Sequence, residues 1–210
     1  MTKYGWRANS INTKKLIVKG KMPVQYVIPK TVATSTVAIL EAQNPHTSTT
    51  ALTNTTILVQ PPYPMVLTVN MKVAGTAGHY DNIEFKGYDA KGNSVRELVY
   101  ITATAATTSY SNNAFARITS VKATNTLTAH AVLKSTDINI GYCAERIGLP
   151  YQIAGTTDIL QYQMGGTCAT TAWGGGASAL SVNKTYDVLT LPSVTAGKVC
   201  SITFLSKVQE

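Results

Sequence analysis

Charged residues are scarce in this chain. Asp, Glu, Lys and Arg make up 13% of its 210 residues, against about 25% in an average soluble domain. Although 44% of the residues are hydrophobic, no apolar run approaches the ~20 residues that cross a bilayer, and residues 1–20 lack the continuous apolar segment of a signal peptide. These absences argue against a membrane partner and predict synthesis in a cytoplasm. A surface poor in charge but rich in Thr, Asn and Gln is typical of a protein that packs against neighbours.

Cysteine is also scarce, and its pattern excludes the common cysteine chemistries. The three cysteines, Cys143, Cys168 and Cys200, are odd in number and form no C-x-x-C pair. Neither a zinc site nor a redox pair is therefore indicated. We expect buried, free thiols.

Histidines and acidic residues show no catalytic spacing. His46, His79 and His130 lie in separate segments, and only His79 has a local partner, Asp81, two residues further on. Because no Ser or Cys nucleophile lies nearby in the sequence, a turn ion pair is favoured over a catalytic dyad. The ten acidic residues are dispersed, and the glycine clusters lack the Lys-Ser/Thr of a phosphate-binding loop. We therefore expect no enzyme, no catalytic or metal-binding residues and no cofactor.

The net charge of +8 is concentrated near the N-terminus. Seven basic residues precede the first acidic residue, Glu41, whereas the other 11 basic residues are nearly balanced by all 10 acidic ones. This asymmetry predicts an extended basic arm over residues 1–60, which either binds an acidic partner or is a solvated, soluble tail. No basic run exceeds two residues and no aromatic residues are interleaved for base stacking, which argues against direct nucleic-acid binding. The partner-binding residues that we expect in the arm are Lys3, Trp6, Arg7, Lys14, Lys15, Lys19 and Lys21.

What the sequence has in abundance is β-forming residues spaced with a period of two. Residues 65–73 alternate apolar and polar side chains, which is typical of a half-buried strand. Residues 83–88 and 94–102 flank the segment Asp89-Ala90-Lys91-Gly92-Asn93. Asp89 can open a turn by accepting backbone N–H groups, and Gly92 can adopt the left-handed conformation that ends it. The sequence therefore predicts a β-hairpin here.

Shorter segments extend this pattern to a whole domain. Strands are expected at residues 24–28, 36–40, 56–59, 117–123, 127–134, 137–143, 186–191 and 199–205, and a single helical turn at 111–116. The prolines at 61, 62 and 64 form a stiff bridge, where we place the boundary between arm and body. We therefore predict an all-β fold, with a β-sandwich or jelly-roll-like body over residues 61–210 and an extended N-terminal arm.

A Gly/Thr-rich stretch near residues 154–182 interrupts the body. It contains two glycine clusters around Trp173, and we expect a long projecting loop or a β-ribbon. Trp173 is a candidate contact residue that can stack on a sugar or anchor in a neighbour's pocket. The alternative, in which Trp173 folds back on its own core, stays open.

Four segments follow one another in a characteristic order. They are Ile83-Glu84-Phe85-Lys86-Gly87-Tyr88-Asp89-Ala90-Lys91-Gly92-Asn93, Ala114-Phe115-Ala116-Arg117-Ile118-Thr119-Ser120-Val121, Ile140-Gly141-Tyr142 and Leu149-Pro150. Residues 77–153 resemble virion structural proteins of tailed bacteriophages. In such proteins a strand, a D-A-x-G-N turn, a returning strand, an "AF-x-x-ITSV" segment and a "GLP" segment follow in this order. The resemblance extends to Lys184-Thr185-Tyr186 and the terminal strand.

The resemblance implies a non-enzymatic structural protein, and first of all a capsid decoration (cement) protein on the capsid surface of a virion. Its partners would be the major capsid protein and neighbouring copies of itself, with a trimer as the expected homo-oligomer. Many copies would bridge capsomers and stabilise the shell by avidity. The alternative within the same family is a neck, tail or fibre component, which contacts a host surface through the loop around Trp173.

Overall fold

The computed structural model describes residues 21–43, 52–53, 59–71, 80–102, 108–123, 138–153, 155–165, 167–168 and 180–207. Within these ranges the protein is an all-β structure of three antiparallel sheets, here named A, B and C. The described residues include no α-helix and one short 3-10 helix, η2 (Thr156–Asp158). None of their helices is long and apolar enough to cross a membrane. The all-β prediction is confirmed at this level.

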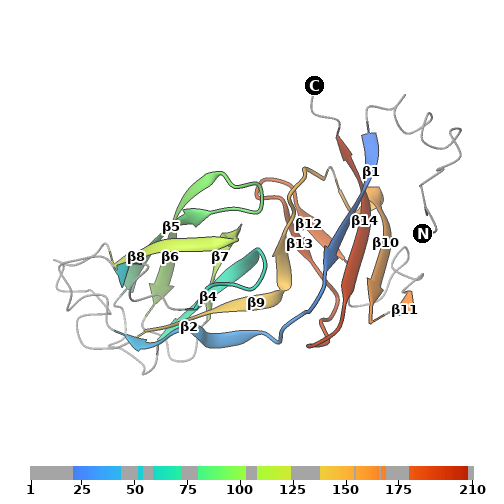
Figure 1. Cartoon of the computed structure of the whole chain (residues 1–210). Helices are drawn as coiled ribbons and strands as arrows, with labels where there is room; N and C mark the ends of the chain where they lie inside the picture. Colours follow the sequence, from blue (N-terminus) through green and yellow to red (C-terminus); the bar gives the residue numbers. More distant parts are fainter. Residues whose placement is uncertain are drawn as a thin grey trace, which may run out of the picture.

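Sheet A joins the beginning of the described chain to its end. Its strand order is β1 (Lys21–Ile28), β14 (Cys200–Lys207), β10 (Ile159–Met164) and β11 (Thr167–Cys168). β1 pairs with β14 along its whole length, from the Lys21–Lys207 pair to the Ile28–Cys200 pair. Figure 1 shows these strands together at one end of the molecule.

Sheets B and C contain the remaining strands. Sheet B has the order β12 (Ser181–Asn183), β13 (Val188–Thr190), β9 (Ile138–Gly148), β4 (Met65–Met71) and β7 (Ser109–Phe115), with β2 (Ser35–Gln43) also paired to β9. Sheet C has the order β3 (Leu52–Thr53), β8 (Arg117–Ala123), β5 (Tyr80–Tyr88) and β6 (Ser94–Thr102). Sheet C lies at the opposite end from sheet A (Figure 1).

Strands β4 and β9 belong to both main hydrophobic cores. Leu67 of β4 and Ile140 of β9 pack in the core shared with β5, β6 and β8. Met65 of β4 and Ile147 of β9 pack in the core shared with β10 and β14. All four side chains are fully buried. The β4–β9 pair therefore connects the two ends of the molecule.

The hairpin of β5 and β6 has the predicted turn. The Asp89 carboxylate accepts hydrogen bonds from the backbone N–H groups of Lys91 and Asn93, each at 2.8 Å. Gly92 has the left-handed φ of 82° that the turn requires. The two strands then pair without interruption from Tyr88–Ser94 to Tyr80–Thr102, so the hairpin prediction is confirmed.

Other predicted strands are present, with different lengths. The strands expected at 24–28, 36–40, 117–123, 137–143, 186–191 and 199–205 correspond to β1, β2, β8, β9, β13 and β14. β9 continues to Gly148, beyond the predicted end at residue 143. The strand expected at 127–134 and most of that at 56–59 lie outside the described residues.

One local prediction, the helical turn, needs correction. The helical turn expected at residues 111–116 is wrong, because this segment is part of β7 and pairs with β4. There Ser111 does not cap a helix, and Ala114 and Phe115 are buried by tertiary packing that overrides the local signal. Within the stretch 154–182, the described residues 159–164 form β10, which lies between β14 and β11 rather than in a projecting loop. The β10–β11 hairpin fits the β-ribbon alternative.

The described part of the predicted arm contributes to the sheets. Ile28 packs in the core against sheet A, and Ile39 and Leu40 of β2 pack in the core against sheet C. The boundary at residue 60 stays a prediction. Cys143 and Cys200 are free and buried, as predicted, and for Cys168 the expectation stays a prediction.

We predict that Gly141→Ala lowers the free energy of unfolding by about 1–3 kcal/mol, the usual cost of forcing extra volume into a packed site. A Cβ at Gly141 would lie 1.8 Å from the carbonyl oxygen of Ser35, where β2 crosses β9. Urea denaturation measures the loss. Gly155→Ala is the matched control, because its nearest neighbour would lie at an ordinary 3.6 Å. Equal stability of the two variants would contradict this account of the β2–β9 contact.

Candidate functional site

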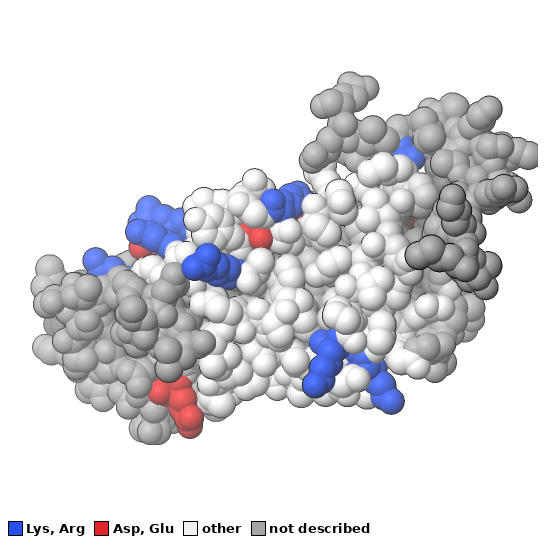
Figure 2. Space-filling model, in the orientation of Figure 1, with Lys and Arg blue, Asp and Glu red and all other residues white. Residues whose placement is uncertain are grey.

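The outer face of sheet C carries a cluster of basic side chains. We call it the sheet C face and define it by the four basic residues Lys86, Arg96, Arg117 and Lys122. Lys86 and Arg96 stand directly opposite each other on β5 and β6, and Lys122 and Arg117 lie on β8, on the other side of β5. Figure 2 shows Lys and Arg side chains gathered over this end of the molecule.

Large apolar and aromatic side chains lie among these cations. Leu98 and Tyr100 of β6 are each 53% exposed, and Tyr88 of β5 is 42% exposed. Tyr88 stands directly opposite Arg117. Such side chains offer contact area that a purely charged surface lacks, and aromatic residues and Arg are enriched where proteins bind proteins.

Among the described residues, one carboxylate, that of Glu84, balances the sheet C face. Glu84, whose side chain is buried, forms ion pairs with Arg96 and, at 3.2 Å, with Lys86. Two cations directly opposite each other on adjacent strands repel, so Glu84 relieves a repulsion that this face would otherwise carry. Burial acts to raise the pKa of Glu84, but the hydrogen bonds and charges of Arg96 and Lys86 act against it and leave the pKa below its ordinary value. Glu84 is therefore ionised at neutral pH.

A second candidate site forms where the pairing of β4 is interrupted on both sides. Toward β9, the pair Met65–Ile147 is followed by Val66–Cys143, so residues 144–146 of β9 bulge. Toward β7, the pair Val66–Ala114 is followed by Thr68–Tyr110, so residues 111–113 bulge. Bulges of this kind redirect side chains and are common beside functional sites.

Buried polar groups hold the β7 bulge in place. Glu97 of β6 is 8% exposed, and its carboxylate accepts hydrogen bonds from the backbone N–H groups of Asn112 and Asn113 and from the Asn113 side chain. The Ser111 hydroxyl accepts from the Leu67 N–H at 2.9 Å and donates to the Asn113 carbonyl at 2.7 Å. These bonds replace the ladder bonds that the bulge removes.

Between the two bulges and the strands β12 and β13 lies a pocket of about 660 Å³. We call it the bulge pocket. Arg146, Asn112 and Thr190 are among its polar lining residues, and Val66 and Val188 belong to its apolar lining. Val66 and Val188 form a small buried cluster with Ala114, apart from the two main cores. The bulge pocket therefore lies on the face of sheet B that points away from those cores.

The cations of the bulge pocket are positioned by neighbouring groups. The Arg146 guanidinium lies 4.3 Å from the centroid of the Tyr110 ring, a geometry in which the ring attracts the cation. Lys184 stands in the turn between β12 and β13, where the Asn183 side chain accepts the Thr185 N–H at 3.2 Å.

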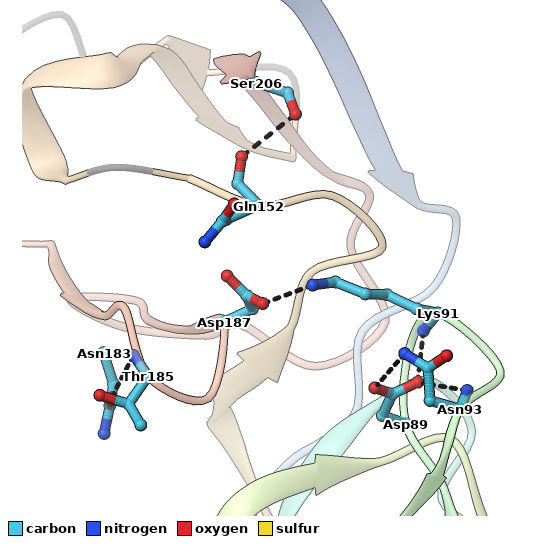
Figure 3. Close-up of polar contacts among 8 residues, drawn as sticks. All are labelled: Asp89, Lys91, Asn93, Gln152, Asn183, Thr185, Asp187 and Ser206. Atoms are coloured by element: carbon cyan, nitrogen blue, oxygen red, sulfur yellow. Dashed lines mark hydrogen bonds and ion pairs between the residues drawn. The ribbon is translucent and has the colours of Figure 1, made fainter. Parts of the chain in front are cut away.

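An ion pair ties this turn to the β5–β6 hairpin. Figure 3 shows Lys91, beside the Asp89 turn, reaching across to Asp187. Its Nζ lies 2.5 Å from the Asp187 carboxylate, and the Asp187 carbonyl accepts the Leu149 N–H at 3.0 Å. The position of Lys184 therefore depends on contacts with two other segments of the chain.

Of the predicted site residues, the structure describes one. Lys21 begins β1, and its ammonium group forms an ion pair with the buried carboxylate of Asp158 in η2. Its role toward a partner stays a prediction. The other arm residues, Lys3, Trp6, Arg7, Lys14, Lys15 and Lys19, lie outside the described residues, as do Trp173 and the three histidines.

Sequence reasoning missed both described sites. One signal was readable: Glu97 occupies an inward position among Val95, Val99 and Ile101, and an acidic residue on a core-facing position needs a buried partner. No comparable signal marks Arg146, because only the bulge in β9 brings it beside Tyr110 and β7.

No group of three or more His, Cys, Asp or Glu side chains in the described ranges is placed to hold a metal ion. Comparisons of the chain with protein-family models, curated proteins and solved structures found no match. The assignment of function therefore depends on the residues themselves.

We predict that Glu97→Ala lowers the free energy of unfolding by about 1–3 kcal/mol, because it leaves the partly buried N–H groups of the β7 bulge without their acceptor. Thermal or urea denaturation measures the loss. Glu97→Gln is the matched control: it keeps one acceptor oxygen and should cost clearly less. If alanine costs no more than glutamine, the carboxylate does not hold the bulge.

We predict that Glu84 contributes to the loss of stability in acid. Because its folded-state pKa is lowered, its ion pairs stabilise the protein above the ordinary carboxyl pKa and lose this contribution as pH falls through the lowered value. Glu84→Gln should therefore be less stable than wild type at about pH 7 and lose less stability on the way to about pH 3. Urea midpoints measured across this range test the sign, with Glu145→Gln at an exposed position as the control for removing one negative charge. Parallel curves for wild type and Glu84→Gln would contradict the assignment.

Proposed function

We propose that the chain is a non-enzymatic structural protein of a tailed-bacteriophage virion, specifically a capsid decoration protein that binds the outer shell and stabilises the capsid lattice. The resemblance over residues 77–153 supports the virion assignment. The sheet C face is the observation that supports binding to a partner surface. In this proposal the body is a β-sandwich, with sheets B and C as its two layers, since one core takes residues from both.

The chemistry of the sheet C face favours an acidic protein surface as the partner. Of its four cations, Lys86 and Arg96 pair with Glu84, so the described part of the face keeps a positive excess. Charge of this kind accelerates encounter and orients the partner. Leu98 and Tyr100 provide the apolar contact that follows. The partner that we propose is the major capsid protein.

Lattice geometry explains how a modest contact can hold. Surface charge pairs contribute little individually, typically below about 1 kcal/mol. When copies of the chain associate, for which a trimer is our proposal, each bound face raises the effective concentration of the next. A decoration protein therefore needs a rigid, repeated surface rather than one tight site. Sheet C is such a surface, because it is fixed by the core beneath it.

We predict that the purified protein co-sediments saturably with empty mature capsids and that high salt weakens the binding. Arg117→Glu combined with Lys122→Glu should weaken it about tenfold or more, because both charges of β8 are reversed. Lys184→Glu combined with Lys198→Glu, at exposed positions outside both the sheet C face and the predicted arm, makes the same change of net charge and is the matched control.

The same experiment uses isolated tails as its second arm. Binding to tails alone would replace decoration by the neck, tail or fibre alternative. Binding to neither particle would reject the virion proposal, and an equal loss in both double variants would reject the sheet C face as the contact surface.

A further inference from the structure

We propose that the bulge pocket binds a sugar that carries a carboxylate, such as a uronic acid residue of a polysaccharide. This inference goes beyond the virion assignment and uses different residues from the sheet C face. It depends on three properties of the pocket: an oriented guanidinium, polar groups that converge from several strands, and an apolar lining.

The carboxylate of the sugar is assigned to Arg146. A guanidinium presents paired N–H donors in a plane that matches the two oxygens of a carboxylate. Stacking on Tyr110 at 4.3 Å limits the rotation of this plane before any ligand arrives. Lys184 adds a second positive charge, and none of the described residues that line the pocket is acidic. One negative charge is therefore favoured at this end.

The hydroxyl groups of the sugar are assigned to the uncharged polar side chains. Arg146, Thr190 and Ser181 stand in one row across β9, β13 and β12, because Thr190 pairs with both of the others. Asn112 and Asn183 line the pocket as well, and side-chain amides both donate and accept hydrogen bonds. Such groups recognise a ligand with many hydroxyls.

The apolar lining suits a sugar ring better than a simple anion. Val182, which is partly exposed, lines the pocket above the buried Val66 and Val188, and the C–H face of a pyranose ring can pack on it. The volume of about 660 Å³ lies in the usual range for small-molecule sites. A phosphate or acetate ion would occupy a small part of this space and would leave the hydroxyl and amide groups unused.

The pocket is held in shape before a ligand binds. The buried Glu97 carboxylate fixes the backbone of Asn112, and the Lys91–Asp187 ion pair fixes the turn that carries Lys184. Rigid walls reduce the entropy that binding must overcome. This matters for sugars, because each of their hydroxyls exchanges a hydrogen bond with water for one with protein.

We test the proposal by titrating the full chain with methyl β-glucuronide and following binding by calorimetry and ligand-observed NMR. Methyl β-glucoside supplies the hydroxyls without the carboxylate, acetate supplies the carboxylate alone, and inorganic phosphate supplies a different anion. We expect saturable binding of the glucuronide, at least tenfold tighter than that of any of the three other probes. Equal or tighter binding of acetate or phosphate would overturn the proposal in favour of a simple anion site, and no saturable binding would overturn it outright.

Variants then assign the binding to the pocket. Arg146→Gln should weaken glucuronide binding at least tenfold, and Arg146→Lys should restore only part of it, because an ammonium group lacks the paired donors. Arg117→Gln on the sheet C face removes the same charge and should bind as wild type does. Unchanged binding by Arg146→Gln, in a variant whose melting temperature equals that of wild type, would place the ligand elsewhere and reject the inference. Since the capsid test assigns binding to residues of the sheet C face, either proposal can fail without the other.

Discussion

The pairing of β4 with β9 is the constraint on which the rest of the structure depends. Seven residue pairs join the two strands, and side chains from both enter the two main cores. Burying a side chain such as Met65, Leu67 or Ile147 stabilises a fold by roughly 1.5–3 kcal/mol. Because these side chains belong to different cores, breaking the ladder would expose both. Sheets A and C therefore do not stabilise themselves separately, although they lie at opposite ends of the molecule (Figure 1).

The bulge in β9 changes which of its side chains face the cores. Ile138, Ile140 and Ala144 are buried at even positions, whereas Ile147 and Leu149 are buried at odd ones. A regular strand cannot change its inward phase, so residues 144–146 absorb the shift. The change of phase puts Ile147 into the core and leaves Arg146 beside Tyr110 on the opposite face. The position of the pocket's main cation is thus a consequence of packing rather than a separate feature.

The register shifts and the bulges explain which parts of the fold and of the two sites could be predicted from the sequence. The β5–β6 hairpin was predictable in detail, since its alternation, Asp89 and Gly92 are local signals. The prediction of a helical turn at 111–116 was wrong. Ser and Asn often cap helices, but Ser111 and Asn112 lie in a bulge. The hydrogen-bond acceptor for this bulge, the Glu97 carboxylate, comes from another sheet. The sheet C face could have been predicted from the sequence, because Lys86 and Arg96 stand opposite each other in a predicted hairpin. The bulge pocket was not, since it depends on register shifts against β4 that no local pattern encodes.

The two sites differ in the kind of recognition that their geometry allows. The sheet C face is a strand surface of spaced charges, and its attraction acts over about a Debye length, roughly 8–10 Å in physiological salt. It can select an acidic surface but distinguishes poorly between two of them. The bulge pocket brings one guanidinium and several neutral groups to a single volume, so it distinguishes ligands by shape and by the position of one charge. A chain that carries both sites can bind a repeated surface through the sheet C face and select a small ligand through the bulge pocket. Neither use requires the sheets to move, because the Lys91–Asp187 pair and the β4–β9 ladder connect both sites to one framework.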